Sequence, residues 1–232
     1  IELGEFYASH LGLTTRRVIG KHVRQLWPNV KGMNVLGIGF PLPYLNAFRG
    51  EAKRVISAMP ASQGVLHWPN EAANQTCLTL ESELPLPDLS IDRVLMIHAL
   101  ECTESVRPMM REVWRVLSEG GRIIVITPNR RGIWTRLERT PFGYGRPYSL
   151  AQLSRLLRDT MFIPMTSSGA LYVPPSKSRM VMSSAPAWEN IGKCWFSALG
   201  GVISVEAGKQ IYAGTPVGET AKRRFFATIP SQ

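Results

Sequence analysis

The sequence contains few cysteines and no long apolar run. Its three cysteines, Cys77, Cys102 and Cys194, are scattered and form no CxxC pair. This spacing argues against a disulfide framework or structural zinc and favours a reducing, cytoplasmic compartment. The four histidines are equally dispersed, so no metal site is expected. The longest apolar runs, 94–97 and 123–126, have the length of strands, well short of the ~18–20 residues of a membrane span.

Acidic residues are also scarce. The chain of 232 residues has 17 acidic and 27 basic residues, a net charge of +10 that marks it as a basic protein. Between Arg107 and Arg158 there are eleven arginines, no lysine and three acidic residues, a local excess of eight positive charges. Such a surface attracts phosphates, nucleic acid or anionic membranes, although a merely solvated surface is the alternative. A hydrophobic content of 44% argues against disorder.

Hydrophobic patterning predicts strands that alternate with helices. Strands are expected at 33–39, 54–58, 77–80, 91–100 and 122–127, and a helix at 106–117 that Gly120 and Gly121 cap. Two helices are expected in the first thirty residues. The last part should hold a helix at 150–158 capped by Ser149, a strand at 170–173, a helix at 187–196 and a strand at 202–212. This alternation predicts an α/β fold, a doubly wound three-layer sandwich around a mostly parallel sheet.

Ligands of such sheets bind at the carboxyl ends of the strands. The glycine pair Gly37-x-Gly39 follows the first predicted strand. A tight strand-to-helix turn explains this pair as well as a bound ligand does. The pair by itself is therefore weak evidence for a ligand site.

Three segments carry a family resemblance. They are LPLPDLSIDRV at 84–94, HALE at 98–101 and REVWRVLSEGGR at 111–122. In this order they resemble class I S-adenosylmethionine-dependent methyltransferases, most closely the type 11 subgroup. The resemblance covers roughly residues 33–129, and the first 30 and last 100 residues add little to it.

The resemblance implies a Rossmann-like fold with seven strands, of which the last is antiparallel, and S-adenosylmethionine as cofactor. It also implies one methyltransferase-like domain over 1–232, with N-terminal helices at 1–30, a cofactor-binding core at 33–129, and a lid loop with closing strands at 130–232. The methionine end of the cofactor is then expected near 37–43, the ribose near 58–60 and the adenine near 81–83, with 98–100 beneath the sulfonium. The implied cofactor contacts are Gly37, Ile38, Gly39, Phe40, Pro41, Met59, Pro60, Glu81, Ser82, His98, Ala99 and Leu100.

The sequence departs from the family pattern in two places. The turn at 37–43 lacks the usual acid and two of three glycines, and its prolines have no N–H to donate, so the N–H groups of Phe40 and Leu42 are expected to face an anion. Residues 57–60 offer no carboxylate for the ribose hydroxyls, with Met59 at the usual acidic position. Losing such a charge-assisted pair costs about 1.5–3 kcal/mol of binding.

Fewer residues indicate where the methyl acceptor binds. Methyl transfer needs alignment more than a catalytic triad, and a base only where the acceptor must lose a proton. His98 is the candidate base, and a structural histidine is the alternative. The arginine-rich loop 129–148 is expected to overhang the pocket as a substrate-binding segment or, alternatively, as a purely structural lid. Its predicted contacts are Arg130, Trp134, Tyr144, Arg146 and Tyr148. The basic cluster at 222–226 is interpreted as a solvated tail.

Methyl transfer to an unidentified, possibly anionic acceptor is the leading hypothesis. The alternative is a non-catalytic methyltransferase-fold scaffold or nucleic-acid-binding protein, with nucleic acid less favoured than a small acceptor. A nicotinamide-dependent oxidoreductase ranks last, because the GxGxxG fingerprint and its acidic partner are missing. The oligomeric state stays open.

Overall fold

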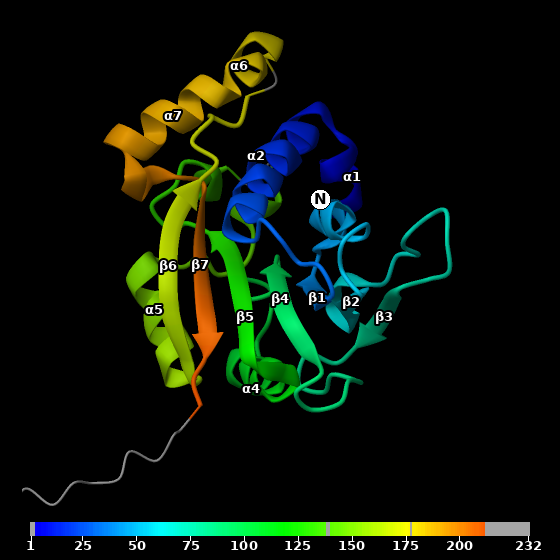
Figure 1. Cartoon of the computed structure of the whole chain (residues 1–232). Helices are drawn as coiled ribbons and strands as arrows, with labels where there is room; N and C mark the ends of the chain where they lie inside the picture. Colours follow the sequence, from blue (N-terminus) through cyan, green and yellow to red (C-terminus); the bar gives the residue numbers. More distant parts are fainter. Residues whose placement is uncertain (1–2, 138–139, 177, 212–232) are drawn as a thin grey trace, which may run out of the picture.

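The computed structural model describes residues 3–137, 140–176 and 178–211 of the chain (Figure 1). The helices are α1 (Leu3–Ala8), α2 (His10–Leu26), α3 (Leu42–Leu45), α4 (Val106–Val116), α5 (Leu150–Asp159), α6 (Arg179–Ser183) and α7 (Ala185–Trp195). Short 3₁₀ turns are η1 (Asn46–Phe48), η2 (Ala61–Gln63), η3 (Trp134–Arg136), η4 (Pro141–Gly143) and η5 (Ser197–Leu199). The strands are β1 (Asn34–Gly39), β2 (Arg54–Pro60), β3 (Thr76–Thr79), β4 (Ile91–Ile97), β5 (Leu117–Pro128), β6 (Phe162–Ala170) and β7 (Val202–Lys209).

One sheet organises these elements. Its seven strands run in the order β3-β2-β1-β4-β5-β7-β6, and β7 is antiparallel to both of its neighbours. The first five strands are parallel, so the predicted fold class is confirmed. The strand order reverses between β1 and β4, which is where open α/β sheets bind their ligands.

Apolar side chains cover both faces of the sheet. Ile19 and Val23 of α2 belong to one core cluster, together with residues of α1, α3, α6 and α7. Met110 of α4 and Leu153 of α5 belong to the other. Figure 1 shows α2 on one face of the sheet and α4 and α5 on the opposite face. The two faces make the three layers that strand and helix alternation predicts.

The predicted helix cap at 120–121 and the strand predicted at 170–173 differ in the structure, and the strand predicted at 91–100 ends at Ile97. Gly120 and Gly121 do not cap α4: the helix ends at Val116, and both glycines lie within β5, beside a register shift against β4. A Cβ at Gly121 would lie 2.5 Å from Leu117 Cγ, so the irregular backbone requires glycine there. The strand predicted at 170–173 is instead β6, which ends at Ala170, just before Leu171 takes a φ of 65°.

The missed part of β6 has a physical reason. The strand lies at the edge of the sheet, where Pro164 costs no ladder hydrogen bond and polar residues can face solvent. Its sequence therefore lacks the apolar run that marks a buried strand. By contrast, Ser149 caps α5 as predicted, accepting a hydrogen bond from Gln152 N at 3.2 Å.

The ends of the chain add two observations. The final strand, predicted to reach Tyr212, ends at Lys209, while Tyr212 and the basic cluster at 222–226 lie outside the described residues. No helix in the described ranges is both long and apolar enough to cross a membrane.

Candidate functional site

The ends of β1 and β4 meet at Gly39. This residue has a φ of 88°, and a Cβ there would lie 2.2 Å from the carbonyl oxygen of Ile97. The next residue, Phe40, donates its N–H to that same oxygen at 2.9 Å. The expectation that the Phe40 N–H faces an anion is therefore wrong, because the neighbouring strand already uses it. Gly39 is required by the close approach of two strands.

A cavity of about 370 Å³ opens at the carboxyl ends of β1 and β2. Helix α1 contributes Leu3 and Gly4, the end of β1 contributes Phe40, and the turn after β2 contributes Gln63 to Leu66. Phe40 is the one predicted cofactor residue in this lining. The sequence pattern missed Gln63, because glutamine in an exposed-looking turn carries no motif.

The other residues assigned to the methionine and ribose ends are buried. Gly37 and Ile38 lie inside β1, where a Cβ at Gly37 would meet Pro41 Cγ at 2.4 Å. Met59 is 0% exposed within the core cluster that includes α2, and Pro60 is the buried last residue of β2. These positions shape the turn. Their predicted contacts with a cofactor stay predictions.

The residues assigned to the adenine lie after β3. Glu81 is half-buried and accepts a hydrogen bond from Thr103 Oγ1, whereas Ser82 is exposed. Partial burial raises the pKa of Glu81. Ala99 and Leu100, which follow β4, are at most 2% exposed.

His98 is the centre of a buried hydrogen-bond chain. It directly follows β4, has a φ of 54° and is 2% exposed. Tyr44 Oη donates to Tyr7 Oη at 2.9 Å, and Tyr7 Oη lies 2.8 Å from His98 Nε2. On the other side of the ring, His98 Nδ1 lies 3.2 Å from Glu101 Oε1.

The donors and acceptors of this chain follow one direction. Tyr44 donates a hydrogen bond to Tyr7, so the Tyr7 hydroxyl donates to His98 Nε2. The imidazole then carries its own proton on Nδ1, which faces Glu101. Burial is the main cause that raises the pKa of Tyr7 well above its usual value, and it also raises that of Tyr44. Both tyrosines are therefore neutral donors at neutral pH.

The described residues of the loop 129–148 pack against these hydrogen-bonded side chains. The Phe142 ring lies 4.9 Å from the His98 ring, centroid to centroid, and Arg146 N donates to the carbonyl of Glu101 at 2.9 Å. Gly145 has a φ of 78°, and a Cβ there would meet the Glu101 carbonyl oxygen at 2.3 Å. The loop is thus bonded to the residues that hold His98.

The predicted acceptor contacts divide into two groups. Trp134 is 1% exposed and donates Nε1–H to the carbonyl of Val173 at 2.8 Å, so it supports the loop from inside. Tyr144, Arg130 and Arg146 are exposed, and Tyr148 is half-buried with a pKa that burial raises. These four are on the accessible side of the loop.

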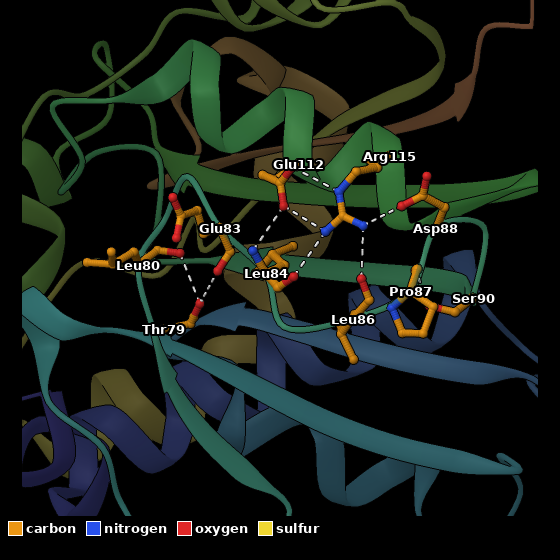
Figure 2. Close-up of polar contacts among 10 residues, drawn as sticks. All are labelled: Thr79, Leu80, Glu83, Leu84, Leu86, Pro87, Asp88, Ser90, Glu112 and Arg115. Carbon is orange, nitrogen blue, oxygen red and sulfur yellow. Dashed lines mark hydrogen bonds and ion pairs between the residues drawn. The ribbon is translucent and has the colours of Figure 1, made fainter.

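The motif that carries the resemblance has a structural explanation (Figure 2). Arg115 of α4 donates to the carbonyls of Leu86 at 2.9 Å and Leu84 at 3.0 Å, and pairs with Asp88 at 2.5 Å. It also bonds Glu112, 2.7 Å away, whose carboxylate accepts Leu84 N–H at 3.0 Å. Hydrogen bonds from Arg115 lower the pKa of Glu112. One arginine thus fixes the loop 84–88, which leads from the end of β3 into β4.

Within the described residues, no three His, Cys, Asp or Glu side chains gather as a metal site requires.

Comparisons with known proteins point to methyltransferases. The family model described as a methyltransferase domain, type 11, matches residues 36–125. A probable S-adenosylmethionine-dependent methyltransferase of Mycobacterium tuberculosis is 33% identical over 95 residues, which are 40% of this chain and 34% of that protein. The ubiquinone/menaquinone biosynthesis C-methyltransferase of Rubrivivax gelatinosus is 25% identical over 143 residues, 59% of this chain and 53% of that protein. The chain thus spans about half or less of the curated relatives it matches.

A solved structure extends the fold comparison to most of the chain. It is a methyltransferase from Thermotoga maritima, described as a possible histamine N-methyltransferase, and it aligns with a TM-score of 0.66 at 16% identity. The alignment covers 90% of this chain and 95% of that one. The match over residues 36–125 and the shared fold support a class I S-adenosylmethionine-dependent methyltransferase of type 11.

Proposed function

We propose that the protein transfers a methyl group from S-adenosylmethionine to an acceptor that carries an anionic group. The observation that supports this most is the cavity of about 370 Å³ at the ends of β1 and β2, beside the point where the strand order reverses. Its volume falls in the range of roughly 300–1,000 Å³ that small-molecule sites occupy.

The residues present fit the cofactor if Gln63 takes the role that a carboxylate has in the family. No carboxylate lies at position 59, but Gln63 lines the cavity, donates Nε2–H to the carbonyl of His98, and has a buried Oε1 without a hydrogen-bond partner. A buried carbonyl oxygen without a partner is costly. We assign this oxygen to a ribose hydroxyl, in place of the family carboxylate.

S-Adenosylmethionine, when bound, supplies a methyl group that its sulfonium already activates. The chain then needs to orient the acceptor and exclude water. Phe40, Tyr7 and Phe142 form an aromatic wall: the Phe40 and Tyr7 rings stack 5.6 Å apart, and Phe142 covers His98. This wall keeps water from the end of β4.

His98 is the proposed proton acceptor, reached through Tyr7. Because Nε2 of His98 already accepts the Tyr7 hydroxyl, we route the proton of the acceptor through Tyr7 rather than directly to the imidazole. The acceptor gives its proton to Tyr7 Oη while Tyr7 passes its own proton to His98 Nε2. Glu101 then stabilises the imidazolium through Nδ1–H.

The exposed side of the loop 129–148 is the proposed acceptor contact. Arg146 emerges next to Glu101, between Tyr144 and Tyr148, and a guanidinium there suits a carboxylate or phosphate of the acceptor. All three cysteines are free thiols, which supports a cytoplasmic location.

Calorimetric titration with S-adenosylhomocysteine tests the cofactor site before any acceptor is known. We expect the wild-type chain to bind, and Gln63→Ala to weaken binding by about tenfold through the lost hydrogen bond. Gln25→Ala, an exposed glutamine on α2 that does not line this cavity, is the matched control and should bind like wild type. Absence of binding by the wild-type chain, or equal binding by all three proteins, contradicts the proposal.

A further inference from the structure

Helix α2 carries an unbalanced positive charge. Residues 6–50 contain six basic residues and no acidic one, and four of the six, Arg16, Arg17, Lys21 and Arg24, are on α2. In the arginine-rich segment 107–158, by contrast, Arg107, Arg115, Arg122 and Arg155 each lie near a carboxylate. Helix α2 is therefore a second concentration of positive charge, separate from the segment 107–158.

These side chains line an open groove of about 630 Å³ between α2 and the α3–η1 turn. Pro43, Tyr44 and Asn46 form the opposite wall, and no acidic residue lines the groove. Arg24 is bonded to Glu51 at 2.6 Å, outside the lining. Arg16, Arg17 and Lys21 are exposed and have no ion pair or hydrogen bond within the described residues. We call this feature the α2 groove.

Gly20 forms part of the groove, in the interior of a 17-residue helix. A Cβ at this position would meet only Tyr44 Cδ1, at an ordinary contact distance of 3.8 Å. Packing within the chain therefore does not require glycine, although glycine inside a helix lowers stability relative to alanine. A bare backbone between cations allows another molecule to approach closely.

We propose that the α2 groove binds the phosphate backbone of a single-stranded nucleic acid. The cations, from Arg16 to Arg24, extend over nine residues and a rise of about 12 Å along the helix, so that more than one phosphate is contacted. Guanidinium groups match phosphate oxygens in bidentate geometry. An open groove lined by cations accommodates an extended chain that passes across it. The groove shares no lining residue with the cavity at Phe40.

Fluorescence anisotropy with a labelled oligouridylate tests this across a NaCl series. We expect Arg17→Gln/Lys21→Gln to weaken binding at least about tenfold and to lower the log–log salt slope by about 1.4, since each phosphate contact on a single strand contributes about 0.7. The matched control is Arg107→Gln/Arg155→Gln, which removes the same charge from exposed positions on α4 and α5. It should retain affinity and slope. Equal losses in both double variants would overturn the proposal, because net charge alone would then explain binding.

A second pair of variants separates shape from charge. Gly20→Gln fills the groove without changing the charge and should weaken RNA binding while the thermal midpoint is maintained. Gly20→Ala adds only a methyl group and should raise the midpoint. RNA binding that Gly20→Gln leaves unchanged overturns the proposal. The proposal is also overturned if inorganic pyrophosphate or phosphatidylglycerol vesicles displace the labelled oligouridylate as well as unlabelled RNA does at the same phosphate concentration.

Discussion

Tyr7 Oη lies 2.8 Å from His98 Nε2, although 91 residues separate the two side chains. The contact joins the N-terminal helix α1 to the end of β4. Tyr7 also accepts a hydrogen bond from Tyr44, so one hydroxyl connects α1, α3 and the sheet. All three residues are at most 6% exposed, and water does not replace a lost partner there.

Tyr7→Phe is therefore expected to lower the free energy of unfolding by about 1–3 kcal/mol, because His98 Nε2 and the Tyr44 hydroxyl both lose a partner inside the core. Urea denaturation followed by circular dichroism measures the change. Tyr144→Phe removes the same atom from a side chain that is 48% exposed, and should leave stability within about 0.5 kcal/mol. Equal stabilities for the two variants would mean that the chain of hydrogen bonds contributes nothing.

Arg115→Ala should destabilise the protein by about 1–3 kcal/mol, because the carbonyls of Leu84 and Leu86 and the carboxylate of Glu112 lose their donor. The guanidinium is about one-third exposed, so the ion pair with Asp88 itself adds little. Arg111→Ala, on the exposed side of the same helix, should change stability by less than about 0.5 kcal/mol. Chemical denaturation of both variants checks the difference, and a stable Arg115→Ala protein would contradict it.

Residues within one local pattern were predictable, and contacts between distant segments were not. Continuous apolar runs identified β1, β4 and the inner part of β5, and period-3.6 spacing identified α4. The pair Gly120-Gly121 looks like a helix cap because local sequence cannot distinguish a cap from a register shift set by the neighbouring strand. Met59 is expected in the site only from its position in the family pattern, and the pleat of β2 directs its side chain into the core. Tyr7 and Gln63 had no signal, because what brings them to His98 is the tertiary fold.

Gly39→Ala is expected to destabilise the fold, because Gly39 lies where two strands approach each other closely. The new Cβ would overlap the Ile97 carbonyl oxygen at 2.2 Å, and the φ of 88° adds strain of about 1–2 kcal/mol. Gly64→Ala is the matched control: its φ is 74°, but nothing lies within 4 Å of the added Cβ. Thermal melts should show a larger loss at Gly39 than at Gly64. Similar losses would show that strain alone acts at both positions.

The last prediction concerns pH. Burial, assisted by the charge of Lys193, lowers the pKa of His22 to about 4, and Ser168 Oγ lies 3.1 Å from its Nε2. In the unfolded chain the pKa of a histidine is about 6.5, so between pH 6.5 and 4 the unfolded state binds more protons than the folded state. His22 therefore contributes its full share of stability above pH 6.5, and this share is lost as the pH falls toward 4, by at most about 3 kcal/mol.

Denaturation midpoints at a series of pH values between 4 and 7 measure this slope. His22→Asn removes the titrating group and should flatten the dependence in that window. His10→Asn, which removes an exposed histidine from the same helix, should leave the slope unchanged. If both variants keep the wild-type slope, the loss of stability at acid pH arises from other groups. If both flatten it equally, burial is not the cause, because His10 is exposed and His22 is 7% exposed.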